Sequence, residues 1–162
     1  MATPAGNDAG GYEDLDPAWA TNGFIYFTRL SVFNEGSCVN WTETMRVNPS
    51  TGVVREWDRS DVAAEQPDAA PDNRLVVFHE WWWDAGCNFG DRIAVANADG
   101  SNIRGVTPMT VNQEWSSDPA FSPDGRRIAF VRGDYIYTVD VSGRGLRRLV
   151  AGSAPNWQPR LR

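Results

Sequence analysis

The chain has 162 residues, with 8 Trp, 15 Gly and 10 Pro, a composition that fits many short strands joined by turns. Its formal net charge is −6, from 21 acidic and 15 basic residues, which disfavours a nucleic-acid partner because phosphates are neutralised by Lys and Arg. No apolar run approaches the roughly eighteen residues of a membrane span, and no segment shows the apolar period of a long helix.

Residues 1–15 are rich in Gly, Ala and Asp, and we expect them to form a flexible lead. This segment has neither the basic start nor the apolar centre of a signal peptide. A first repeat follows over residues 16–65. Its apolar runs and turn residues predict four strands, at 17–20, 24–30, 43–48 and 53–57.

The second repeat covers residues 66–117 and the third covers residues 118–154. The second has predicted strands at 66–70, 75–81, 92–97 and 103–107. The third has an inner strand led by Pro119, followed by strands at 128–131, 135–141 and 146–150. A final inner strand is expected at 155–159, and residues 160–162 form a tail.

One proline marks the start of each repeat and reveals the period. The prolines at 17, 67, 119 and 155 are separated by intervals of 50, 52 and 36 residues. In the third repeat, Pro123 presets the φ of the second turn position, Asp124 follows, and Gly125 accepts the left-handed geometry at the exit. Periods of this size are typical of repeat arrays, and of propeller blades among all-β folds.

The third repeat, with the sequences SPDGRRIAF, IYTVDVSG and LRRLV, and the PNWQP segment after it resemble the WD40-like repeat of the TolB type, often called PD40. The resemblance implies four antiparallel strands per blade, lettered A at the centre to D at the rim. We therefore expect an all-β fold of three four-stranded antiparallel propeller blades. It also implies a periplasmic or secreted location. Three blades leave two open edges, so either further blades of a longer chain or a second copy in a homodimer would complete the propeller.

The long connections are expected to lie on one face of such a propeller, where the B to C and D to A segments emerge. Two of them, SVFNEGSCVNWT and WWWDAGCNFGD, carry the two cysteines. Cys38 and Cys87 occupy matching loops of neighbouring blades, so a disulfide between them is expected if their Cα atoms come within about 7 Å. It would contribute about 3 to 4 kcal/mol by restricting the unfolded chain. The alternative is two unpaired thiols in a reducing compartment.

Trp81, Trp82 and Trp83 are consecutive, so they cannot all enter one core, because strand residues alternate between the two faces of a sheet. One interpretation is an aromatic binding platform on the loop face, suited to a peptide or a sugar. The other is that two of these indoles fill gaps between blades, including the space beside Ala69. The complete candidate set is Trp81, Trp82, Trp83, Asp84, Asn88, Phe89, Trp41, Glu35 and Trp115.

Three aromatic residues, Trp19, Phe121 and Trp157, recur at one repeat position, so the pattern predicts that they are core residues between blades. The only histidine, His79, is expected to be packed or hydrogen-bonded, since no spacing indicates partners for catalysis or metal binding. The sequence has no GxSxG elbow and no glycine-rich phosphate loop.

These observations predict a noncatalytic binding or scaffold module without a cofactor or metal, which recognises a protein or peptide through its long-loop face. The first alternative is a carbohydrate-binding propeller that uses its Trp-rich loops. The second is an accessory propeller segment of a larger hydrolase or peptidase.

Overall fold

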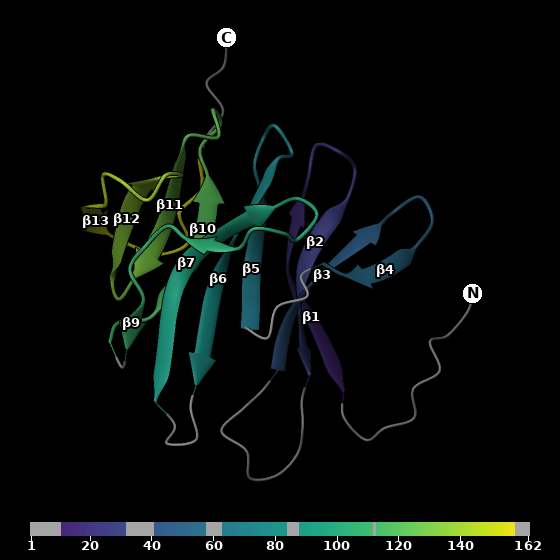
Figure 1. Ribbon diagram of the computed structural model, residues 1–162, viewed down its shortest axis with the longest axis horizontal. Coiled ribbons are helices and arrows are strands. Elements are labelled where there is room, and N and C mark those ends of the chain that lie inside the picture. Colours follow the sequence, from purple (N-terminus) through teal and green to yellow (C-terminus); the bar gives the residue numbers. More distant parts are fainter. Residues whose placement is uncertain (1–10, 32–40, 58–62, 84–87, 112, 158–162) are drawn as a thin grey trace.

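The computed structural model describes residues 11–31, 41–57, 63–83, 88–111 and 113–157, and it leaves the side chains of Trp41 and Trp83 undescribed. These residues form three antiparallel sheets that lie side by side (Figure 1). In each sheet, four strands follow one another in chain order from the innermost to the outermost. The fold is therefore all-β, with three four-stranded blades, as the repeats predicted.

The first sheet consists of β1 (Tyr12–Trp19), β2 (Ile25–Ser31), β3 (Trp41–Asn48) and β4 (Val53–Glu56). The second consists of β5 (Ala63–Ala69), β6 (Leu75–Trp83), β7 (Phe89–Asn97) and β8 (Arg104–Gly105), and β9 (Thr110–Val111) adds a short pairing to β7. The third consists of β10 (Ser116–Phe121), β11 (Arg127–Arg132), β12 (Tyr135–Asp140) and β13 (Arg147–Ala151). β9 lies between the last predicted strand of the second repeat and the start of the third, where no strand was predicted.

Each inner strand begins earlier than predicted, at Tyr12, Ala63 and Ser116. The reason is a β-bulge at the proline. The pairing with the next strand shifts register between Leu15 and Ala18, and equivalent shifts occur in β5 and β10. Proline has no N–H to donate to the ladder, so the chain bulges there and resumes its pairing on the other side.

The residue before each of these prolines has a left-handed backbone. The φ angles are +51° at Asp16, +54° at Gln66, +50° at Asp118 and +47° at Ala154. Asp visits this region more easily than most residues because its short side chain can hydrogen-bond locally. The same bend therefore recurs four times at one position of the repeat.

The hydrophobic core lies between neighbouring blades. Alternation along β6 directs Val76 and Phe78 into the cluster shared with the first blade, and directs Val77 into the cluster shared with the third. Trp57 fills the first of these clusters, with its ring centroid 5.8 Å from that of Tyr26 and 5.6 Å from that of Phe78. The middle blade is thus buried on both faces.

The recurring aromatic position of the repeat differs in burial from one blade to the next. Phe121 is 6% exposed and belongs to the core, and Trp157 is half-buried and donates its indole N–H to the Ala120 carbonyl at 3.1 Å. Trp19 is 69% exposed, so the prediction that it is a core residue is wrong. Phe121 packs toward the blade that precedes its own, and the described residues contain no blade before β1.

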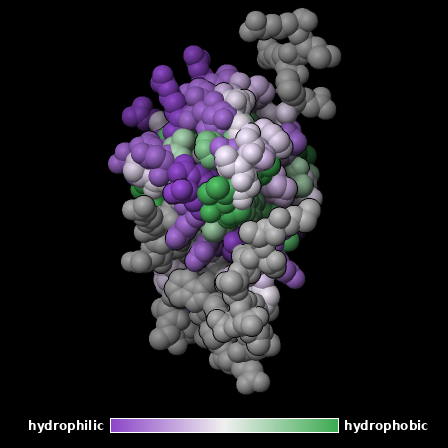
Figure 2. Space-filling model, turned by 90° about the vertical axis from the view of Figure 1, so that its right-hand side faces the viewer, coloured by the Kyte–Doolittle hydropathy of each residue, from purple (hydrophilic) through white to green (hydrophobic). Residues whose placement is uncertain are grey.

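The side of the molecule that carries the first blade shows hydrophobic residues gathered among hydrophilic ones (Figure 2). The exposed apolar and aromatic side chains of this blade are Tyr12, Leu15, Trp19, Val53 and Val54. Within the described ranges, no helix is long and apolar enough to cross a membrane.

Candidate functional site

An aromatic cluster lies at the loop end of the second and third blades, and we call it the Trp115 cluster. It consists of Trp115, His79, Trp81 and Phe89. The Trp115 ring centroid is 4.6 Å from that of His79, 5.4 Å from that of Phe89 and 6.3 Å from that of Trp81. Trp115 is 38% exposed, whereas Trp81 and His79 are buried. Trp115 is therefore the member of the cluster that a partner can reach most readily.

Strand alternation explains how this cluster forms. His79 and Trp81 are two residues apart on β6, so they share the face that packs toward the third blade. Phe89 and Asp91 have the same relationship on β7, and Asp91 lies directly opposite Trp81. Trp115 immediately precedes β10 and packs against these residues.

Asp91 fixes the segment that carries Trp115. Its side chain is fully buried, accepts the hydroxyl proton of Thr110 at 2.6 Å, and accepts the backbone N–H of Ser116 at 2.8 Å. The Trp115 carbonyl accepts the backbone N–H of Gly133 at 3.1 Å. Both backbone hydrogen bonds therefore fix the peptide group between Trp115 and Ser116, directly after the exposed indole.

His79 lies beneath Trp115 and is flanked by two carboxylates. Its Nδ1 is 3.7 Å from Glu65 Oε1 and its Nε2 is 3.5 Å from Asp91 Oδ2. Both distances exceed ordinary hydrogen-bond lengths, and neither ring nitrogen has a hydrogen-bond partner among the described residues. The expectation of a packed histidine is confirmed, and its acidic neighbours come from two other strands.

The charge on His79 and the charges on its two neighbouring carboxylates affect one another. Burial by itself lowers the pKa of His79, but the carboxylates of Asp91 and Glu65 outweigh that effect and raise the pKa above its ordinary value of 6.5. Burial by itself raises the pKa of Asp91, but the nearby His79 imidazole and the hydrogen bonds from Thr110 and Ser116 lower it overall. His79 is 0% exposed, so it can hold a proton but does not meet a substrate at the surface.

The tryptophan triplet divides between the two faces of its sheet, as alternation predicted for the two described side chains. Trp81 is 5% exposed on the face toward the third blade. Trp82 is half-buried, and its indole lies against Gly90, where a Cβ would come within 2.7 Å of the ring. Trp82 does not fill the space beside Ala69, because Ala69 pairs with Val76, about 20 Å away along β6.

Of the remaining candidates, Asn88 is exposed and Phe89 is half-buried in the Trp115 cluster. Glu35, Asp84, Cys38 and Cys87 lie outside the described residues, as do the side chains of Trp41 and Trp83. Asp91 and Glu65 were not among the residues predicted from the sequence. The sequence did contain a signal for Asp91, because this acidic residue lies on the same face of its strand as the inward-facing Ile93 and Val95.

A hollow of about 280 Å³ lies where the three inner strands meet, and the four repeat prolines, Pro17, Pro67, Pro119 and Pro155, with their preceding residues line most of it. Asp118 connects to the second blade there, because its N–H donates to Gln66 Oε1 at 2.9 Å. Burial, with added repulsion from Glu65 and Asp118, raises the pKa of Asp16. Within the described part of the chain, no group of three or more His, Cys, Asp or Glu side chains is arranged to hold a metal ion.

No protein-family model matches the sequence. No curated protein matches it either. Solved structures do match the fold. A putative TolB from Agrobacterium tumefaciens has a TM-score of 0.63 and 19% identity, over 94% of this chain and 56% of that one.

TolB from Acinetobacter baumannii has a TM-score of 0.60 and 17% identity, over 84% of this chain and 32% of that one. An oligogalacturonate lyase from Vibrio parahaemolyticus has a TM-score of 0.61 and 16% identity, over 87% of this chain and 42% of that one. The chain thus spans between about a third and just over half of the length of these structures. Its structural neighbours are TolB-like β-propellers, and it has their fold.

Proposed function

We propose that the chain is a noncatalytic binding module that recognises a protein or peptide through the face carrying the Trp115 cluster. The observation that carries this proposal is the exposed Trp115 indole on a backbone fixed by Asp91 and Gly133. Tryptophan dominates many protein interfaces, because it presents a large contact area with few rotatable bonds. A side chain that is already positioned loses little further freedom when a partner binds.

The surroundings of Trp115 support recognition of a peptide more than catalysis. The only histidine is buried beneath the indole, so its imidazole is not exposed to a substrate at this surface. Glu114 is exposed next to Trp115 and supplies a charge at the rim of the cluster. An apolar centre with a polar rim is the usual arrangement of a protein interface.

A random-peptide display library and a glycan array test this proposal together. We expect selected peptides to bind the wild-type protein and to lose at least about tenfold in affinity in Trp115→Ala, as at an interface hot spot. Trp19→Ala is the matched control, since Trp19 is also exposed but lies on the first blade. Selection of glycans alone would replace the peptide proposal with the carbohydrate alternative.

Trp115 also packs on His79, so its removal can change stability as well as binding. Glu114→Lys provides a second test, because it changes only an exposed charge beside the indole. We expect this variant to unfold at the wild-type temperature and to change peptide affinity. Peptides that bind both variants as tightly as the wild type would show that the site lies elsewhere.

We also propose that Cys38 and Cys87 form a disulfide and that the protein works in a periplasmic or secreted setting. Their matching positions in neighbouring repeats support the pairing, although both residues lie outside the described structure. Mass spectrometry after thiol alkylation tests it: we expect the unfolded protein to gain mass only when it is reduced first. Two alkylated cysteines without reduction would contradict the pairing.

A further inference from the structure

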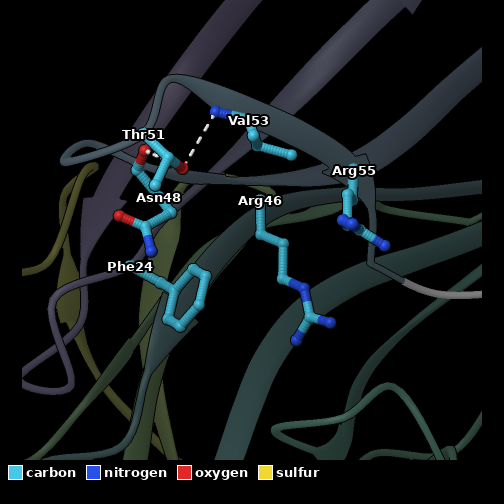
Figure 3. A pocket seen from close by; sticks show the side chains of 6 residues that line it. All are labelled: Phe24, Arg46, Asn48, Thr51, Val53 and Arg55. Atoms are coloured by element: carbon cyan, nitrogen blue, oxygen red, sulfur yellow. Dashed lines mark hydrogen bonds between the residues drawn. The ribbon is translucent and has the colours of Figure 1, made fainter.

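The outer part of the first blade contains a hollow of about 290 Å³, away from the Trp115 cluster. At about 30 Å³ per molecule of liquid water, it has room for about ten waters, and so for a small organic ligand. Figure 3 shows the six side chains that line it: Phe24, Arg46, Asn48, Thr51, Val53 and Arg55.

The hairpin between β3 and β4 places both arginines on the same face. Arg46 lies directly opposite Arg55, and Asn48 lies directly opposite Val53, so alternation aligns all four side chains. The turn is built by Asn48, whose carbonyl accepts the N–H of Gly52 at 2.8 Å. The hydroxyl of Thr51 accepts the N–H of Val53 at 3.3 Å, which closes the rim of the hollow.

This arrangement places two positive charges opposite each other on paired strands. Two cations directly opposite each other on paired strands destabilise a sheet. Among the described residues, neither Arg46 nor Arg55 forms an ion pair. Arg46 lies over the Phe24 ring, with Cζ 5.5 Å from the ring centroid, which is a favourable cation–π distance.

The carboxylate of Asp99, in the neighbouring blade, already has other partners. It accepts a hydrogen bond from the hydroxyl of Ser101 at 2.6 Å and another from the backbone N–H of Ser101 at 3.0 Å. These two hydrogen bonds are the main causes of the lowered pKa of Asp99, and attraction to Arg46 only adds to them. The two guanidinium groups therefore keep donors that no described carboxylate occupies, in a chain whose net charge is −6.

We propose that this hollow binds a small organic anion. Its carboxylate or phosphate group lies between the guanidinium groups of Arg46 and Arg55, and its apolar or ring portion packs on Phe24 and Val53. Guanidinium forks match the planar or tetrahedral oxygens of such groups and form charge-assisted hydrogen bonds with them. The anion also removes the repulsion between the opposed arginines, which gives a reason for their pairing.

The hollow combines two apolar side chains, Phe24 and Val53, with four polar ones, so it suits a ligand that has both an apolar portion and a charged group. In Figure 3 the amide nitrogen of Asn48 points toward Phe24, so it adds a neutral donor beside the ring. The oxygen of the same amide is engaged in the turn, where it accepts the N–H of Ser50 at 2.9 Å. The site is separate from the Trp115 cluster, so its test is independent of the proposed function.

Calorimetric titration with three ligands of similar shape tests the chemistry at fixed ionic strength. Phenyl phosphate and benzoate carry the two candidate anionic groups on the same ring, and benzyl alcohol is the neutral control. We expect at least one of the anions to bind with one-to-one stoichiometry and benzyl alcohol to show no binding. The ratio of the two anion affinities then distinguishes a phosphate site from a carboxylate site.

Three arginine variants test the location. Arg46→Gln and Arg55→Gln each remove one guanidinium group, and each is expected to weaken the better anion by at least about tenfold, because hydrogen bonds to charged groups are strong. Arg144→Gln removes the same charge from an exposed turn of the third blade and should leave the affinity unchanged. Arg55→Gln is expected to fold normally, because Arg55 is exposed on an outer strand.

Three results would overturn the proposal: no binding of either anion, equal weakening in all three variants, or undiminished binding in both Arg46→Gln and Arg55→Gln. Equal weakening would show a general effect of net charge. Thermal unfolding with and without the anion adds an independent measurement. If the arginines repel each other, Arg55→Gln without ligand unfolds at a temperature no lower than the wild type, and the anion raises the unfolding temperature of the wild type and of Arg144→Gln by more than that of Arg55→Gln.

Discussion

Trp19 and Phe121 occupy the same position of the repeat, but their surroundings are opposite. Phe121 is 6% exposed, packs among the residues of the second blade, and donates its backbone N–H to Asp68 of that blade at 2.7 Å. Trp19 is 69% exposed, and most of β1 is exposed with it. The comparison shows that this repeat position packs toward the preceding blade and becomes core only where such a blade is present.

A large exposed aromatic group on an open sheet face marks a surface suited to another protein segment. Tyr12 and Leu15 accompany Trp19 on β1, at 69% and 43% exposure. We propose that a further blade covers this face, supplied by a second copy of the chain or by another part of a longer propeller. The difference in burial between Trp19 and Phe121 then indicates whether that blade is present.

The largest expected effect comes from truncating the two aromatic side chains. Phe121→Ala removes a buried ring and leaves a cavity, so the free energy of unfolding is expected to fall by about 3 to 5 kcal/mol. Trp19→Ala is expected to change it by less than about 0.5 kcal/mol in dilute solution, as at other exposed positions. Denaturant unfolding of both variants measures the difference. Equal losses would show that Trp19 is buried in solution.

Association gives the second test of the same contrast. Light scattering over a range of protein concentrations reports whether copies of the chain cover the β1 faces of one another. If they do, the mass approaches that of a dimer, and Trp19→Ala returns it to that of a monomer. A monomer at all concentrations would exclude the second copy and leave a blade of a longer propeller as the remaining form of the proposal.

Much of the fold was predictable because its signals are local. The turn of Pro123 to Gly125, the recurring prolines and the alternating apolar runs gave the three blades and most strand positions. Alternation also predicted that Trp81 and Trp82 would lie on opposite faces. The early starts of the inner strands were missed, because the register of a bulged pair depends on the partner strand.

The candidate site was less predictable because its members are brought together by three strands. His79, Glu65 and Asp91 belong to β6, β5 and β7, and nothing in their spacing indicates that the carboxylates flank the imidazole. The environment of Trp19 was missed for a related reason. A repeat pattern assigns equivalent positions, but exposure depends on which neighbours are present, and end repeats have fewer of them.

The interface between the second and third blades contains the buried, titratable His79 as well as apolar side chains. The pH dependence of stability measures the contribution of its charge. Because its pKa is raised in the fold, the stabilisation is complete below the ordinary value of 6.5 and is lost as the pH rises through the raised value. We expect the free energy of unfolding to decrease over that range. Each tenfold difference in proton affinity between the folded and unfolded states contributes about 1.4 kcal/mol.

His79→Gln provides the control, since it keeps a polar side chain but does not titrate. Its free energy of unfolding should lack the decrease above pH 6.5, although the variant is less stable than the wild type below that pH. Asp91 contributes in the opposite direction, because its pKa is lowered and its stabilisation is lost as the solution becomes acidic. Identical pH profiles for His79→Gln and the wild type would contradict a charged His79.

A small gain in stability is expected at Asp16, on the inner edge of the open face. Burial and the neighbouring carboxylates raise its pKa, so its ionised form is disfavoured in the folded protein. Asp16→Asn removes the charge and keeps a residue that tolerates φ of +51°. At neutral pH we expect a gain in the free energy of unfolding of less than about 1 kcal/mol, because solvent screens this exposed group. Asp134→Asn, in an exposed turn of the third blade, is the charge-matched control and should give no gain.

The gain at Asp16 also depends on whether the face beside it is covered. A blade packed against β1 would remove more water from Asp16, and the cost of ionising a carboxylate rises as water is removed. The stabilisation by Asp16→Asn should therefore increase under conditions where light scattering shows association. A gain that equals that of Asp134→Asn at every concentration would mean that net charge alone is responsible. It would also mean that no further blade packs against β1 beside Asp16.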